Sequence, residues 1–277
     1  METIIEAVQR KYSNKSGQLE FQVVFNDRVG NDFNTLFASL PEHGRNYFAA
    51  AVAASFYGRV FPSSSIHIAY SSAALNWLSK APEGLTVEGS PAWNGGKIHY
   101  SGAPDAVARA YEQQFEEDME MFFRCRAQEI AAGGLILIIM AAVADTHCQH
   151  RVAKMLTSIE SILIDMVKEG VLSQERVDSF NVPIVFPCVE DIRRLVGKIN
   201  SFEIVKMEMI KGESAMEGGT ETAVMHIRAG LEGTLTNHFG NEIVEQVFVR
   251  AMQHQQKLHF AQINTSTTGV FAVIKRN

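Results

Sequence analysis

The residues best suited to chemistry stand where apolar runs of the sequence end. Asp27 directly follows the run 19–25, and Ser55 with Phe56 follows the run 48–54. In nucleotide-binding α/β folds, a carboxylate at a strand end can accept hydrogen bonds from both ribose hydroxyls. An aromatic ring at the neighbouring strand end can stack on adenine. The alternatives are an ordinary loop or capping role for Asp27 and a core position for Phe56.

Trp77, one of only two tryptophans in the chain, is the next candidate. Its indole N–H needs a hydrogen-bond acceptor when the ring is buried, and a carboxylate is one such acceptor. Plain packing in the core is the alternative.

A further polar group combines Asp178, the backbone carbonyl of Phe180, and Asn181, with Asn94 from a glycine-rich loop at 81–103. Carboxylate, carbonyl and amide oxygens are ligands that magnesium prefers. Capping and turn roles are the alternative, because Asp and Asn are common in turns.

His147, Cys148 and His150 also have the chemistry of metal ligands. Their spacing lacks a fourth ligand, so we interpret them as incidental. The three cysteines are odd in number and widely spaced, which favours a reducing compartment over a disulfide framework.

The predicted elements place the first of these residues along one edge of a sheet. Apolar and β-branched runs predict strands at 19–25, 48–54, 65–70 and 135–140. Helical spacing predicts helices at 4–12, from Asn31 or Asp32 to Leu40, from Ser71 or Ser72 to Lys80, and from Asp105 to about 132. Gly133-Gly134 is expected to end the long helix, and 135–140 to be a parallel strand covered on both faces. The alternation indicates a doubly wound α/β sheet, whose ligands bind at the carboxyl ends of the strands.

The second half of the chain is mostly helical. Its periodicity predicts helices at 151–169, 189–198, 220–238 and 241–259, and strands at 202–210 and 269–275. We interpret it as a helical cap inserted before the last two strands of the sheet.

Composition restricts the function classes. In 277 residues, 46 % are hydrophobic, and 25 basic against 31 acidic residues give a net charge of −6. The sequence has no cluster of basic residues, so nucleic-acid and polybasic membrane partners are not expected. The most apolar stretch, 131–143, is shorter than the roughly 20 residues needed to cross a bilayer. The first residues show no secretory signal, so a cytoplasmic location is expected.

Several blocks together resemble the SABATH family of plant methyltransferases. These enzymes use S-adenosylmethionine to methylate small carboxylic acids or xanthine-type nitrogens. The blocks follow in family order over essentially the whole chain: Phe25-Asn26-Asp27, Asn31–Phe37, Ser55–Pro62, Ser71–Ser79, Asn94-Gly95-Gly96, Asp178–Pro183 and His238-Phe239-Gly240.

The resemblance implies a Rossmann-like methyltransferase core over 1–145 and about 200–277. A helical cap over about 146–200 and parts of 212–262 would form the acceptor pocket. S-adenosylmethionine would be held by Asp27, Arg28, Ser55, Phe56 and Ser72. Asn76 and Trp77 would bind a small acid. Asn94, Asp178, Phe180 and Asn181 match the family's magnesium positions.

The implied reaction is direct displacement. A carboxylate, with a reference pKa of about 4, is already a nucleophile at pH 7 and needs no general base. Catalysis would then rest on proximity and orientation.

The chain departs from the family pattern at its start. Family members have an earlier strand that ends in a glycine-rich turn and lies at the centre of the sheet, between the strands matching 19–25 and 65–70. Without it, either those two strands pair directly or the chain is unstable. The alternatives to an active methyltransferase are therefore an inactive truncated protein, a subunit that pairs with a complete relative, and a binding module that keeps only the acid pocket. A homodimer is also compatible with the resemblance.

Overall fold

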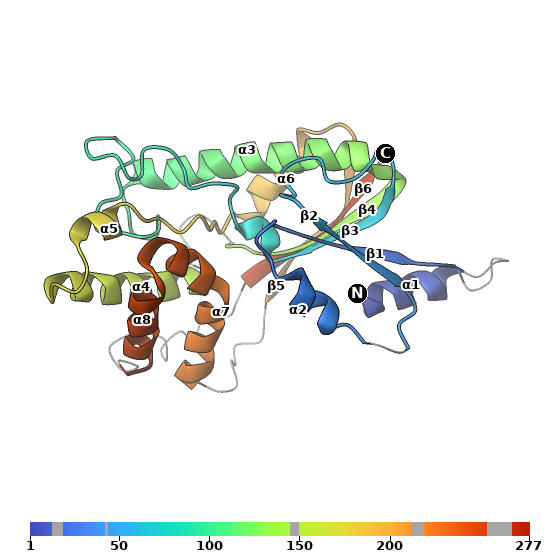
Figure 1. Cartoon of the computed structure of the whole chain (residues 1–277). Coiled ribbons are helices and arrows are strands. Elements are labelled where there is room, and N and C mark those ends of the chain that lie inside the picture. The colour runs from blue at the N-terminus through green and yellow to red at the C-terminus, as the bar shows by residue number, and fades with distance from the viewer. Residues whose placement is uncertain (13–18, 42–43, 145–149, 212–218, 254–267) are drawn as a thin grey trace. The chain divides into compact units, whose positions relative to one another are not determined.

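The computed structural model describes the whole chain except residues 13–18, 42–43, 145–149, 212–218 and 254–267 (Figure 1). The chain divides into two compact units, Met1–Val60 and Phe61–Asn277. This division does not test the predicted boundaries between core and cap, which stay predictions.

The first unit contains the predicted helices and strands of the first 60 residues. They are α1 (Glu2–Tyr12), β1 (Gln22–Asp27), α2 (Phe33–Ala38) and β2 (Phe48–Ala53). β1 and β2 run parallel and in register from the Gln22–Phe48 pair to the Asp27–Ala53 pair. Asp32 caps α2 as expected, because its Oδ1 accepts a hydrogen bond of 3.0 Å from the backbone N–H of Thr35.

The second unit is built on a mixed sheet of β3 (Ile66–Ser72), β4 (Ile130–Ala141), β6 (Thr268–Arg276) and β5 (Phe202–Lys211), in that spatial order. β3 and β4 are parallel, whereas β6 is antiparallel to both of its neighbours. The predicted α/β class is confirmed.

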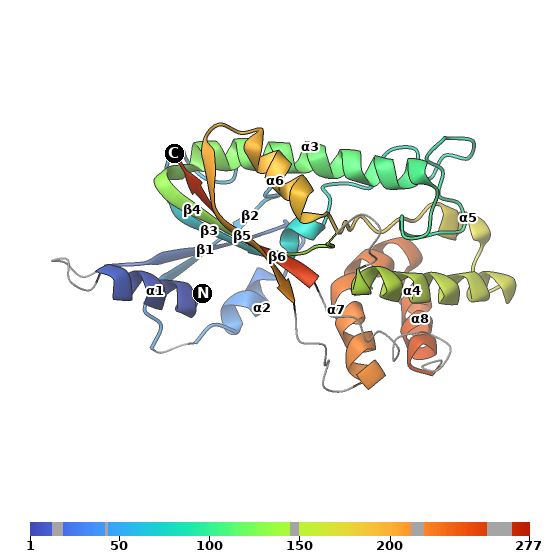
Figure 2. The same cartoon turned by 180° about the vertical axis from the view of Figure 1, so that it is seen from behind.

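Two helices, α3 (Asp105–Glu129) and α6 (Val189–Gly197), pack on this sheet and on each other (Figure 2). The predicted apolar face of α3 is buried, because its members recur every three or four residues: Val107, Tyr111, Phe115, Met119, Phe122 and Phe123.

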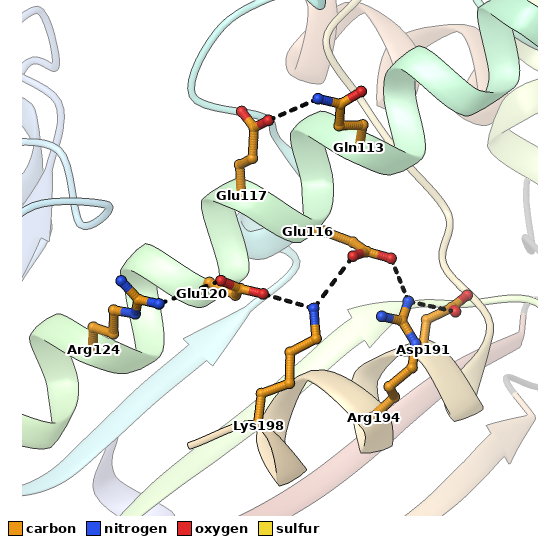
Figure 3. Close-up of polar contacts among 8 residues, drawn as sticks. All are labelled: Gln113, Glu116, Glu117, Glu120, Arg124, Asp191, Arg194 and Lys198. Carbon is orange, nitrogen blue, oxygen red and sulfur yellow. Dashed lines mark hydrogen bonds and ion pairs between the residues drawn. The ribbon is translucent and has the colours of Figure 1, made fainter.

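Charged side chains join the exposed faces of these two helices (Figure 3). Arg194 on α6 contacts Glu116 on α3 and Asp191 on its own helix, at 2.5 and 3.2 Å. Lys198, just after α6, reaches Glu120 on α3 at 2.6 Å. These pairs are partly exposed, so each contributes little to the stability of the unit.

The remaining helices of the second unit pack around an apolar core of their own. They are α4 (Arg151–Lys168), α5 (Gln174–Asp178), α7 (Gly219–Phe239) and α8 (Asn241–Gln253). The sequence did not predict the short α5, and residues 254–259 of the last predicted helix lie outside the described part of the chain. None of the described helices combines the length and apolarity needed to cross a bilayer.

The prediction that Gly133-Gly134 ends the long helix is wrong. α3 ends at Glu129, and both glycines lie inside β4. Gly133 has a φ of +76°, and a Cβ on Gly134 would lie 2.8 Å from the carbonyl oxygen of His67. The pair therefore forms an irregularity that lets β3 approach closely, where the β3–β4 register shifts.

The faces of β4 also differ from expectation. Ile136, Ile138 and Met140 are fully buried, but the residues between them are only half-buried. The strand is therefore not covered equally on both faces.

The predicted helix from Ser71 or Ser72 to Lys80 is also wrong. β3 continues through Ser72, and Ala73 then takes a left-handed conformation with a φ of +58°. Only a single 3-10 turn follows, η1 (Ala74–Asn76). The backbone pairs with another segment instead of continuing as a helix, since the N–H of Leu78 donates to the carbonyl of Pro183 at 2.8 Å.

β1 and β3 lie in separate sheets of the described structure. Of the two outcomes considered for a missing central strand, direct pairing of these strands is not observed.

Candidate functional site

The predicted donor-binding residues of the first unit, Asp27, Arg28, Ser55 and Phe56, lie at the carboxyl ends of β1 and β2. The Asn26 amide donates to the carbonyls of Val52 and Ala54, both at 2.9 Å, and the N–H of Ala54 donates to the carbonyl of Asp27. These bonds lock the carboxyl ends of β1 and β2 side by side. Ser55 therefore lies just beyond the residue opposite Asp27.

The Asp27 carboxylate is exposed, and only one of its two oxygens accepts a hydrogen bond from a described residue. Its Oδ1 accepts a 2.7 Å hydrogen bond from the N–H of Arg28, and among the described residues its Oδ2 accepts none. The capping of α2 belongs to Asp32, so the alternative of a helix-capping aspartate does not apply to Asp27. One carboxylate oxygen remains available to a hydroxyl donor.

Ser55 and Phe56 form a turn at the end of β2. The Ser55 hydroxyl accepts from the N–H of Tyr57 at 3.3 Å, and its carbonyl accepts from the N–H of Gly58. Phe56 is half-buried, with its ring centroid 4.7 Å from that of Tyr57. It is not a fully buried core residue.

In the second unit, Ser72 ends β3 in an exposed position, and Asn76 and Trp77 follow through η1. Trp77 is half-buried beside the apolar core of the cap helices. The side chain of Asn76 is instead buried and bonded to backbone.

Three of the four predicted magnesium residues, Asn94, Asp178 and Asn181, come together at the glycine-rich loop, but their polar atoms do not fit a cation. The ring of the fourth, Phe180, packs against His238 and Phe239. The Asn94 amide donates to Oδ1 of Asn181 at 2.6 Å, which occupies a predicted ligand oxygen. Oδ1 of Asp178 accepts from the N–H of Gly96 and from Gln174, at 2.6 and 2.7 Å. Asn94 Oδ1 is buried without a partner in the described structure, but so is the Nδ2 of Asn181, and an N–H group repels a cation.

This cluster thus ties the glycine-rich loop to the last residue of α5 and to the segment that follows it, through Gly96 with Asp178 and Asn94 with Asn181. The described residues also contain no group of three His, Cys, Asp or Glu arranged to hold a metal ion. The donor set does not fit magnesium.

His150 has a structural role, in agreement with its interpretation as incidental. Its Nδ1 accepts from the N–H of Val152 at the start of α4, and Nε2 lies 3.1 Å from the carbonyl of Thr268. Its ring stacks on Phe186. His147 and Cys148 lie outside the described residues.

A cavity of about 360 Å³ opens between α3, α6 and residues 185–188. Aromatic side chains line it, including Tyr100, Tyr111 and Phe186, and Glu112, Glu116 and Arg194 stand among its polar residues. None of the predicted site residues lies in its wall.

Three aromatic residues that sequence reasoning did not assign to the site support the segment Val182–Cys188, which we call the anchored segment. Tyr111 donates its hydroxyl to the carbonyl of Val182 at 3.0 Å. The hydroxyl of Tyr100 accepts from the N–H of Phe186, also at 3.0 Å, and His99 Nε2 lies 2.9 Å from the carbonyl of Ile184. A His-Tyr pair, His99-Tyr100, inside the glycine-rich loop was the available signal.

Burial of His99 gives the second unit a pH-dependent stability. Desolvation lowers the pKa of His99 from 6.5 to about 4. The unfolded chain therefore takes up a proton that the folded chain excludes between pH 6.5 and 4. This stabilisation, of the order of 3 kcal/mol, is complete above pH 6.5 and is lost as the pH falls toward 4.

Urea unfolding at pH 7, 5.5 and 4.5 measures this effect. His99→Gln should flatten the pH dependence, whereas the same change at the exposed His67 should leave it unchanged. If the free energy of unfolding changes equally with pH in the unmodified chain and in the His99 and His67 variants, this role of His99 is contradicted.

Comparisons with known proteins place these observations in a family. The family model described as SAM dependent carboxyl methyltransferase matches residues 1–277. Loganic acid O-methyltransferase of Catharanthus roseus is 37 % identical over 282 residues, covering 100 % of this chain and 76 % of that protein. Paraxanthine methyltransferase 2 of Arabidopsis thaliana is 35 % identical over 271 residues, covering 94 % of this chain and 76 % of that protein.

The fold comparison agrees. A solved structure of loganic acid methyltransferase with S-adenosylhomocysteine matches with a TM-score of 0.93 at 36 % identity, covering 100 % of this chain and 80 % of that chain. This likeness confirms the predicted methyltransferase fold. The chain belongs to the S-adenosylmethionine-dependent carboxyl methyltransferases, the SABATH family of plants.

Proposed function

We propose that this chain binds S-adenosylmethionine at the carboxyl ends of β1 and β2 and methylates the carboxylate of a small plant acid. The observation that carries the proposal is the Asp27 carboxylate. It stands at a strand end that Asn26 fixes to β2, and it keeps one oxygen free of partners among the described residues. A ribose hydroxyl needs such an acceptor.

The other roles are those that the resemblance to the family implies. Ser55 would hydrogen-bond the adenine amine, and the half-buried Phe56 would stack on the adenine ring. Arg28 would flank the adenine through its backbone, and Ser72 would line the donor pocket. The indole of Trp77 would donate to the acid. When bound, S-adenosylmethionine supplies an activated methyl group.

The protein would then act by placing the acid next to the methyl group and by excluding water. A carboxylate needs no general base at neutral pH. Magnesium has no part in this proposal, since the Asn94, Asp178 and Asn181 side chains engage one another and the glycine-rich loop.

The second candidate is a protein that binds the donor without transferring methyl. It differs from the first candidate in one outcome, because it would bind S-adenosylhomocysteine and yield no methylated product. A ring-nitrogen acceptor is the other chemistry to test, because a paraxanthine methyltransferase is among the relatives.

Two measurements test the proposal on the chain as it stands. Calorimetry with S-adenosylhomocysteine should show saturable binding at one site. Incubation with methyl-labelled S-adenosylmethionine and a panel of iridoid, terpenoid and aromatic acids should yield a labelled methyl ester. Binding without an ester or a labelled xanthine would favour the second candidate, and no heat of binding would contradict both.

A further inference from the structure

Asn76 is buried in the second unit with its side chain fully engaged by backbone. It is 5 % exposed. Its Nδ2 donates to the carbonyls of Ala141 and Val185, both at 2.8 Å, and its Oδ1 accepts from the N–H of Ala141 at 2.9 Å. The Asn76 carbonyl also accepts from the N–H of Val185 at 2.9 Å.

These bonds leave the amide no N–H for an acceptor acid, because a primary amide has two donors and both are used. They join three places that are far apart in the sequence: η1, the end of β4 and the anchored segment. Asn76 therefore acts as a joint between chain segments.

The residue that follows this joint is Trp77. Its backbone forms an antiparallel bridge with Ile184, and the N–H of the next residue, Leu78, donates to the carbonyl of Pro183 at 2.8 Å. The position of the indole therefore depends on the anchored segment, which Asn76 holds at Val185.

The anchored segment is itself held from a second side. The N–H of Val182 donates to the carbonyl of Ile98 at 2.7 Å, and Tyr111, His99 and Tyr100 bond to Val182, Ile184 and Phe186. Asn76 thus connects Trp77 to the anchored segment, whose backbone groups already have hydrogen-bond partners on this second side.

We infer that Asn76 is a positioning residue: it sets the place of the Trp77 indole and does not itself contact the acid. This inference rests on the proposed function for its catalytic consequence, and on geometry alone for its structural one. It differs from the substrate-binding role that the family resemblance implied for Asn76.

The test separates the two consequences. In a Trp93→Phe background, Trp77 is the only tryptophan, so its emission reports the surroundings of its indole. Asn76→Ala should shift this emission in the free protein, without donor or acid, because the joint is lost. In the methyl-transfer assay, KM for every active acid should rise together, by the order of 10- to 100-fold, while the affinity for S-adenosylhomocysteine is kept.

Two further variants keep the result interpretable. Asn76→Asp has the same shape but replaces the two N–H donors by an oxygen that faces the carbonyls of Ala141 and Val185, so it should shift the emission as well. Phe123→Leu lowers the stability of the same unit, because Phe123 is fully buried against Phe202, but it should leave the Trp77 emission unchanged.

An unchanged emission in both Asn76 variants, with KM raised for some acids only, would overturn the inference and assign Asn76 to acid contact. If no acid is methylated by any protein, the proposed function fails, but the emission measured without ligand still decides the role of Asn76.

Discussion

Replacing Asp27 with alanine should weaken S-adenosylhomocysteine binding by about 100-fold, because charge-assisted hydrogen bonds to ribose hydroxyls are the strongest polar contacts expected at this edge. Asp27→Asn should bind with intermediate affinity, since an amide oxygen still accepts a hydrogen bond but carries no charge. Calorimetry with S-adenosylhomocysteine gives the affinity of each variant.

Asp32→Ala is the matched control, five residues farther along. Its carboxylate caps α2 through the N–H and the hydroxyl of Thr35, so the variant should lower the melting temperature and leave the affinity unchanged. If Asp27→Ala binds as tightly as this control, the donor site does not lie at the end of β1.

Replacing Glu129 with alanine should lower the free energy of unfolding of the second unit by about 3–5 kcal/mol, because it removes the carboxylate from a buried ion pair with Arg126. Arg126 and Glu129 contact each other at 2.8 Å at the end of α3, with side chains only 6 % and 0 % exposed. The N–H of Phe61 also loses the acceptor that Glu129 provides at 3.2 Å.

Glu83→Ala breaks an exposed pair of similar length, Lys80–Glu83 at 3.0 Å, with side chains 55 % and 87 % exposed. Solvent screens this pair, so the variant should unfold at the same urea concentration as the unmodified chain. Equal destabilisation by both variants would show that burial does not set the strength of the Arg126–Glu129 pair.

The local sequence pattern predicted those helices and strands in which buried residues recur at a regular spacing. The apolar face of α3 recurs every three or four residues, and β2 was placed within one residue at each end. Asp27 could be assigned to a strand end for the same reason, since an apolar run stops there.

Contacts between distant segments could not be predicted in this way. Gly133-Gly134 has the pattern of a helix end, but the close approach of β3, more than 60 residues earlier, keeps it in a strand. The family resemblance implied a pocket role for Asn76, and its bonds to Ala141 and Val185, 65 and 109 residues away, could not be predicted from the local sequence. Of the predicted magnesium residues, Asn94 and Asn181 bond to each other, whereas Asp178 bonds to Gly96 and Gln174.

The anchored segment has a consequence for how this region can change over evolution. The partners of this segment bond to its backbone N–H and C=O groups from Val182 to Pro187. Every amino acid except proline has both of these groups. Insertion or deletion of one residue would move each carbonyl past its donor, and it would also move the buried side chains of Val182, Ile184 and Phe186 out of their places in the core. Between α5 and α6, selection should therefore preserve the number of residues as well as their apolar character.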